Sequence, residues 1–256
     1  MNYSLLLVVV ALVFFLLLLG AMQLGRLARG RAAAESPGAA AIEASVFALL
    51  GLLMAFTFSG AAQRMTERRN LLVQEVNAIG TAWLRVDLLD AADQPALRDQ
   101  FRRYVDERIR YYAHVADLRG RDAIAEKVSA LQQSLWTRSV QASRHTAPPL
   151  AAAYIGAVNE MFDVAGAQTV AQKVHPPAAT YVFLGFLALV CACLVGRHLA
   201  DAQGRGLFHQ LVYAVVMTTA LYIIVDFEFP RLGVIRIDQS DALLAAQRAA
   251  MIDPAP

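Results

Sequence analysis

The sequence predicts an all-α membrane protein in which four transmembrane helices are joined by a helical soluble domain between the second and third. Four apolar runs carry almost no charge, although 17% of the 256 residues are charged. Each run is close to the roughly 20 residues that a helix needs to cross a bilayer. Between the second and third runs, apolar residues recur every three or four positions, and no long stretch alternates with period two. This spacing indicates amphipathic helices and no sheet.

The first two spans are predicted at Leu5 to Leu24 and at Ala44 to Ala62, separated by a loop with Pro37 and Gly38. We expect the first span to be retained, because no basic residue precedes it and it is longer than the apolar core of most signal peptides; cleavage is the less favoured alternative. One face of the second span consists of small residues. Such a face usually serves helix packing, and it can also line a pore. Its members are Ala44, Ala48, Gly51, Ala55, Ser59 and Ala62.

The second span continues without a helix breaker into an amphipathic helix that reaches about Leu89. Its predicted buried stripe consists of Met65, Leu72, Val76, Ile79, Trp83 and Val86. Its other faces are predicted to hold Arg64, Glu67, Arg68, Arg69 and Glu75. Three more helices are predicted, from Asp93 to Gly120, from Arg121 to Arg144 and from Leu150 to Lys173. The aromatic residues of the first have the spacing of a helix core, which we favour over a ligand box: Phe101, Tyr104, Tyr111 and Tyr112.

The last two spans are predicted at Ala178 to Val195 and at Leu207 to Val225, followed by a short helix that ends near Met251. The predicted division is therefore transmembrane helices 1 and 2 in residues 1–62, a helical domain in 63–175, transmembrane helices 3 and 4 in 176–229, and a tail in 230–256. Because even numbers of spans separate them, both termini and the helical domain lie on one side of the membrane. Basic residues near the span ends are too evenly balanced to identify that side.

Little catalytic chemistry is visible in the sequence. Nucleotide-binding, metalloprotease and hydrolase motifs are absent, and the five histidines have no ligand spacing. Cys191 and Cys193 lie in an apolar run, which favours packing over a disulfide or a metal site, and the net charge of +2 argues against nucleic acid. Asp226 and Glu228 follow the last span, where a salt bridge or an interfacial anchor is favoured over a metal site. We therefore expect no enzyme activity, no metal and no cofactor.

The segment LLGLLMAFTFSGAAQRMTERRN, residues 49–70, resembles the second transmembrane helix of the bestrophins, which are pentameric anion-selective channels. The likeness is an R-[FM]-x-E-x-R-N ending after Ser59, formed by Arg64, Met65, Glu67, Arg69 and Asn70. DFEFPRLG more weakly resembles the turn after the last bestrophin span, through Asp226, Glu228, Pro230 and Gly233. The whole chain is similar to an uncharacterised bacterial family described as bestrophin-like.

The resemblance implies a homo-oligomer, a pentamer, in the bilayer of the bacterial cytoplasmic membrane, with the termini and helical domain in the cytosol. Small anions would pass along the second span at Ala48, Leu52, Phe56 and Ser59. Ala48 replaces a bulky residue of the bestrophin neck, and Thr57 and Phe58 stand where bestrophins have Arg and Asn. No acidic run resembles a calcium clasp, so no calcium control is expected. The alternative is a non-conducting membrane scaffold or sensor whose helical domain binds a partner; an enzyme is a third, weaker hypothesis.

Overall fold

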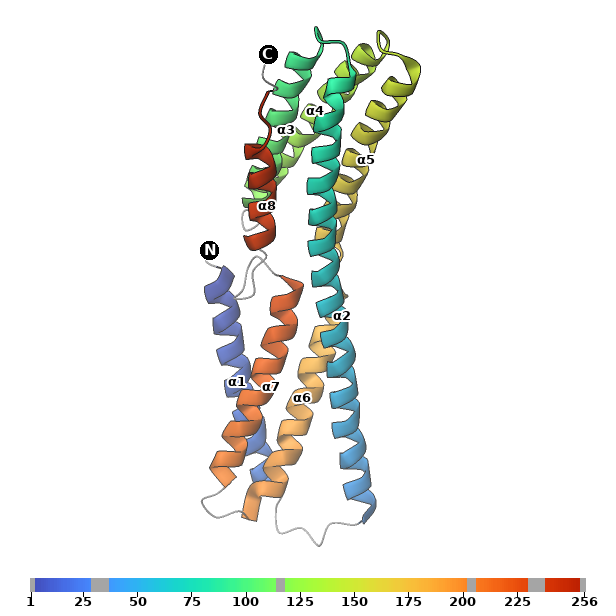
Figure 1. Ribbon diagram of the computed structural model, residues 1–256. Coiled ribbons are helices and arrows are strands. Elements are labelled where there is room, and N and C mark those ends of the chain that lie inside the picture. The colour runs from blue at the N-terminus through green and yellow to red at the C-terminus, as the bar shows by residue number, and fades with distance from the viewer. Residues whose placement is uncertain (1–2, 29–36, 114–117, 202–205, 230–237, 254–256) are drawn as a thin grey trace. The chain divides into compact units, whose positions relative to one another are not determined.

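The computed structural model describes residues 3–28, 37–113, 118–201, 206–229 and 238–253, and helices dominate all of these ranges (Figure 1). Within them no strand occurs. The chain divides into two compact units. One comprises Met1–Met65 with His175–Ile235, and the other comprises Thr66–Val174 with Arg236–Pro256. The boundary falls inside a single helix, α2 (Pro37–Leu84), which supplies residues to both units.

The first unit is the membrane unit, which contains α1 (Tyr3–Ala28), the first part of α2, α6 (Ala178–His198) and α7 (Gly206–Glu228). Among the described residues, four helical segments are long and apolar enough to cross a membrane, one at each predicted span. The predicted fold class is confirmed, and the four apolar segments overlap the four predicted spans. Many apolar side chains face outward, as lipid-facing residues do. The buried core includes Leu18, Met22, Leu184, Ala188, Cys191 and Ile224.

Helices α1 and α6 cross in close contact because glycines face the partner backbone. A Cβ on Gly25 would overlap the carbonyl oxygen of Cys193, and a Cβ on Gly196 would overlap that of Met22. Small residues at such crossings let membrane helices approach closely enough for backbone packing. The free thiol of Cys191 is buried beside this crossing, as expected of a packing residue.

Polar residues of the membrane unit pair between helices. Gln23, which interrupts the first apolar run, donates from Nε2 to Oε1 of the buried Gln210 at 3.5 Å. Near the start of α2, a Glu43 oxygen lies 2.5 Å from Nε2 of His198, at the end of α6. The Gln23–Gln210 contact connects α1 with α7 in a part-buried position, where unpaired polar groups are costly. The Glu43–His198 contact connects α2 with α6 in an exposed position.

The second unit is the helical domain. It contains the rest of α2, the 3-10 helix η1 (Arg85–Leu88), α3 (Gln94–Ala113), α4 (Leu118–Ser143), α5 (Pro148–Lys173) and α8 (Asp238–Ala249). Arg248 of α8 holds Asp106 of α3 through Nε at 2.8 Å and Nη2 at 3.1 Å. Most of the predicted stripe of α2 is buried in this core, although Val76 is only partly buried and Met65 lies outside it. The predicted aromatic core residues of α3 are all buried. Buried members of this core include Leu72, Ile79, Trp83, Phe101, Tyr104, Tyr154 and Met161.

Several predicted helix boundaries are wrong. Helix α2 begins at Pro37 and contains Gly38, because proline suits the first position of a helix, where its missing N–H is not needed. Gly120 was expected to end a helix but lies inside α4. One glycine inside a helix costs only about 1 kcal/mol, which the packing of a long helix can outweigh.

Two charged residues of α2 were predicted on its solvent-facing sides, and this prediction is wrong. Arg68 and Glu75 are buried, Glu75 completely. Glu75 lies between Leu72 and Ile79 on the packed stripe of the helix, so the helical period carries it inward with them. Each has charged or carbonyl partners from other helices, without which burial would be prohibitive.

Candidate functional site

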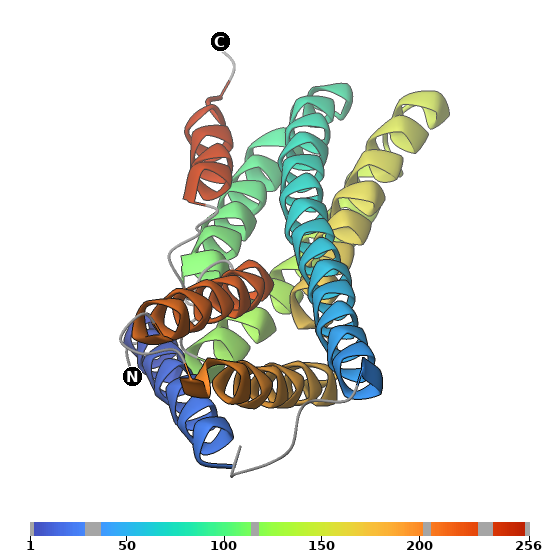
Figure 2. The same cartoon turned by 90° about the horizontal axis from the view of Figure 1, so that it is seen from below.

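The four residues predicted to line a pore are all exposed on α2 in the single chain: Ala48, Leu52, Phe56 and Ser59. Leu52 is 52% exposed and Phe56 is 66% exposed. The small residues Ala44, Gly51 and Ala55 are exposed as well. Figure 2 looks along the membrane unit and shows α6 between α1 and α2, so α2 stands at the margin of the unit. We call the surface of Ala48, Leu52, Phe56 and Ser59 the outer face of α2.

Other residues of α2 pack against the unit. Leu50 and Ala61 are buried, and the Phe58 ring lies 5.4 Å from that of Phe227 in α7. Thr57 donates from Oγ1 to the carbonyl oxygen of Leu53 in the same helix, at 2.7 Å. The two positions that depart from the bestrophin pattern, Thr57 and Phe58, therefore have partners within the membrane unit.

The buried carboxylate of Glu228, at the end of α7, contacts residues from two other parts of the chain. Arg64 of α2 donates from Nε to Oε2 of Glu228 at 2.9 Å, and its Nη2 lies 2.8 Å from the same oxygen. Nδ1 of His175, just before α6, lies 2.9 Å from Oε1 of Glu228. The His175 ring also stacks on Phe229, with ring centroids 4.8 Å apart. We call Arg64, His175 and Glu228 the ion-pair cluster.

The ion-pair cluster joins residues that the sequence analysis had placed in two separate motifs. Arg64 opens the R-[FM]-x-E-x-R-N ending, and Glu228 belongs to the segment after the last apolar run. Asp226 and Glu228 were expected beyond the span, but α7 continues through both, and both are buried. The helix can extend this far because Arg64 compensates the charge of Glu228. Pro230, Arg231 and Gly233 lie outside the described residues.

The remaining motif residues differ in environment. Met65 is half-buried, whereas Glu67, Arg69 and Asn70 are exposed. Beyond Asn70, α2 exposes further uncharged polar residues at spacings of three and four: Gln74, Asn77 and Thr81.

Arg68 is a structural residue whose role sequence reasoning missed. It donates from Nε to the carbonyl oxygen of Ala171 at 3.0 Å and from Nη2 to that of Val174 at 3.2 Å. These carbonyls belong to the end of α5, where a cation suits the negative end of the helix dipole. Gln168 returns a bond from Nε2 to the carbonyl oxygen of Arg68, at 3.2 Å. Nothing local to Arg68 in the sequence distinguishes it from the exposed Arg69.

A second buried ionic group lies inside the helical domain. Arg108 of α3 donates from Nε to Oε1 of Glu75 at 2.6 Å and from Nη2 to the Tyr112 hydroxyl at 2.7 Å, and that hydroxyl donates to Oε2 of Glu75. Burial lowers the pKa of Arg108, but Tyr112 and Glu75 raise it by more, so the pKa lies above its ordinary value. Burial raises the pKa of nearby Tyr104 to about 12, opposed by Arg108.

The described residues contain no group of three His, Cys, Asp or Glu side chains arranged to hold a metal ion. The chemistry that the geometry offers is an exposed face of small and apolar residues on a membrane helix, and buried ion pairs that hold this helix in place.

Comparisons with known proteins agree with this arrangement. A family model described as Bestrophin-like domain matches residues 5–242. A search of curated proteins finds no match. Among solved structures, a bacterial bestrophin homolog from Klebsiella pneumoniae aligns with a TM-score of 0.67 and 16% sequence identity, covering 94% of this chain and 95% of that one. A crystal structure described as a membrane protein aligns with a TM-score of 0.68 and 15% identity, covering 97% of this chain and 99% of that one.

Proposed function

Since the chain belongs to the bestrophin-like family, we propose that it forms a homo-oligomeric ion channel, with small anions passing through a pore lined by α2. The observation that carries the proposal is the uncovered outer face of α2. Ala48 and Ser59 are small enough for copies of the helix to meet around an axis. Leu52 and Phe56 are bulky, exposed and apolar, and rings of such side chains gate channels by excluding water.

The proposed pore is built from five copies of the chain, as the family resemblance implies. Ala48, Leu52 and Phe56 are each four residues apart, so their rings stack about 6 Å apart along the axis. Phe56 has the largest side chain of the set and forms the narrowest ring. The ring of Ala48 is wide, which leaves Leu52 and Phe56 as the constriction.

The ion-pair cluster has a positioning role in this proposal. Arg64 lies slightly more than two helical turns beyond Phe56. Its bonds to Glu228, which His175 also contacts, fix α2 against α7 and the start of α6. The motif residues Met65, Glu67, Arg69 and Asn70 continue the lining helix into the helical domain. Asp226 is buried near the end of α7, in the segment that resembles the turn after the last bestrophin span.

Selectivity for anions rests on the family resemblance and on the lack of acidic residues between Ala48 and Ser59. Family resemblance also supports the proposal that the protein lies in a bacterial cytoplasmic membrane, with the termini and the helical domain of residues 63–175 in the cytosol.

Cysteine accessibility tests whether the outer face of α2 lines a conducting pore. In a background with Cys191→Ala and Cys193→Ala, Phe56→Cys and Ser59→Cys are reconstituted into liposomes and treated with a charged methanethiosulfonate reagent. We expect treatment to reduce halide flux through both variants, because a charged adduct narrows the pore. Phe186→Cys is the control, since Phe186 is similarly exposed but lies on α6.

Equal inhibition of Phe56→Cys and Phe186→Cys would contradict the assignment of α2 as the lining helix. Absence of flux from correctly inserted protein would favour the non-conducting scaffold or sensor.

A further inference from the structure

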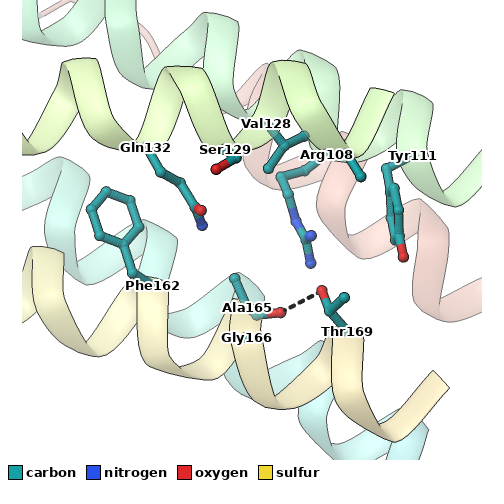
Figure 3. A pocket seen from close by; sticks show the side chains of 10 residues that line it. Arg108, Tyr111, Val128, Ser129, Gln132, Phe162, Ala165, Gly166 and Thr169 are labelled. Carbon is teal, nitrogen blue, oxygen red and sulfur yellow. Dashed lines mark hydrogen bonds between the residues drawn. The ribbon is translucent and has the colours of Figure 1, made fainter. Parts of the chain in front are cut away.

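The helical domain contains a cavity that the proposed channel function does not use. It lies between α3, α4 and α5 and has a volume of about 260 Å³. Figure 3 shows the side chains around it. The polar part of the wall is formed by Arg108, Ser129, Gln132 and Thr169, and Phe162 and Val128 provide apolar surface. Its volume is slightly below that of most drug-sized ligand sites, so it suits a small molecule.

Arg108 is the charged group of this cavity. Its side chain is only 3% exposed, and in Figure 3 the guanidinium group extends from α3 into the space beside α5. Nε is bound to Glu75 and Nη2 donates to Tyr112. No residue in the described part of the chain accepts a hydrogen bond from Nη1. The end of the guanidinium group formed by Nη1 and Nη2 therefore has N–H donors left for an acceptor in the cavity.

The other groups of the wall complete a site for one end of a molecule. Thr169 lines the cavity, but its hydroxyl hydrogen is already donated to the carbonyl oxygen of Ala165 at 2.9 Å, so it offers no donor to a ligand. Ser129 and the Gln132 amide supply further donors. Phe162, Val128 and Ala165 offer an apolar surface beside them. The arrangement therefore has a cationic, donor-rich side and an apolar side.

We propose that this cavity binds a small carboxylic acid with a short apolar body, its carboxylate on Arg108 and its body against Phe162 and Val128. The planar end of a guanidinium group matches the two oxygens of a carboxylate, and charge-assisted bonds of this kind are about twice as strong as neutral ones. Glu75 already balances part of the Arg108 charge, which favours a monoanion over a doubly charged phosphate.

Gly166 offers a way to fill the cavity without disturbing its ionic group. It lines the cavity, and a Cβ at this position would meet no other atom within 4 Å. Gly166→Met should therefore place a side chain in the site while leaving Arg108 and Glu75 paired. Gly156 is the matched control, because it lies on the same helix, also has open space at its Cβ, and does not line the cavity.

The test uses the full-length protein in detergent, with 3-methylbutanoate as the probe and 3-methylbutanamide as its uncharged counterpart. Thermal unfolding of the helical domain is followed by the fluorescence of Trp83 and Trp136, the two tryptophans of the chain. Chloride replaces the probe at equal ionic strength in the reference samples. We expect 3-methylbutanoate to raise the unfolding midpoint of wild type and of Gly156→Met, because a ligand that binds the folded state stabilises it.

We expect the rise to disappear in Gly166→Met, and the amide to bind about tenfold more weakly than the carboxylate, a difference of about 1.4 kcal/mol. Ser129→Met, which fills the cavity from α4, replaces Gly166→Met as the filled variant if Gly166→Met fails to fold. A rise of equal size in the filled variants would overturn the proposal. No rise in wild type would overturn it too, and equal binding of the amide would overturn the role of Arg108.

Discussion

Some charged side chains of the helical domain are buried, and their burial is tolerated only because partner residues compensate the charge. Glu75 and Arg108 are 33 positions apart in the sequence, so no local sequence pattern predicts that they pair. The one available signal is that Glu75 lies in register with Leu72 and Ile79, which places a carboxylate on the buried stripe. A buried acid on such a stripe requires a cation from another element, and the sequence alone does not say which of the many arginines supplies it.

Glu75→Gln tests the importance of this pair. The substitution leaves the guanidinium group of Arg108 buried without its counter-charge, and we expect a loss of about 3–5 kcal/mol in the free energy of unfolding. Urea titration followed by tryptophan fluorescence measures it. Asp99→Asn is the control, because Asp99 and Arg103 form an exposed pair on the same α3 helix, worth about 0–1 kcal/mol. Similar losses in the two variants would contradict a special role for the buried pair.

Two buried tyrosines predict a loss of stability in alkaline solution. Burial raises the pKa of Tyr104 to about 12 and that of Tyr154 to about 12, against an ordinary value of 10 in the unfolded chain. The folded state therefore holds these protons more tightly. Their contribution is complete below pH 10 and is lost as the pH rises to about 12, at about 3 kcal/mol for each tyrosine.

The measurement is the urea midpoint of tryptophan fluorescence at several pH values between 9 and 12. Tyr104→Phe, which has no proton to lose at this position, should show about half the alkaline loss of wild type. The same slope in wild type and Tyr104→Phe would contradict the assignment of this pH dependence to Tyr104.

At the scale of whole elements, the apolar runs predicted the spans well, because a charge-free run of this length forms few stable structures other than a membrane-spanning helix. The ends of helices were predicted less well. Helix α7 extends through Asp226 and Glu228 because Arg64 from α2 neutralises Glu228, a contact between residues 164 positions apart. The small-residue face of α2 was recognisable from the sequence, but spacing alone does not separate packing from pore lining.

The close crossing of α1 and α6 gives a prediction at this scale. Gly25→Ala introduces a Cβ that would overlap the Cys193 carbonyl oxygen, so the helices must separate. We expect a cost of about 1–3 kcal/mol, the usual penalty of overpacking. Gly20→Ala on the same helix meets nothing within 4 Å and should be tolerated. Size-exclusion chromatography after heating in detergent compares the two; equal survival of both variants would contradict the close crossing.

At the scale of the whole molecule, the chain combines a membrane unit with a helical domain, and α2 belongs to both. In the membrane unit α2 presents an outer face that the other described helices leave exposed. In the helical domain the same helix contributes Glu75 to the buried ionic group and Arg68 to the end of α5. These contacts are consistent with the proposal that α2 is the lining helix of a pore.

Halide flux into proteoliposomes, measured for wild type beside Phe56→Ala, tests the central proposal most directly. If Phe56 forms the constriction of a pore, shortening its side chain widens the ring and flux rises above wild type. Phe186→Ala, on the exposed surface of α6, should leave flux unchanged. Flux that does not differ between wild type and Phe56→Ala would contradict the assignment of Phe56, and no flux from either correctly inserted protein would contradict the channel itself.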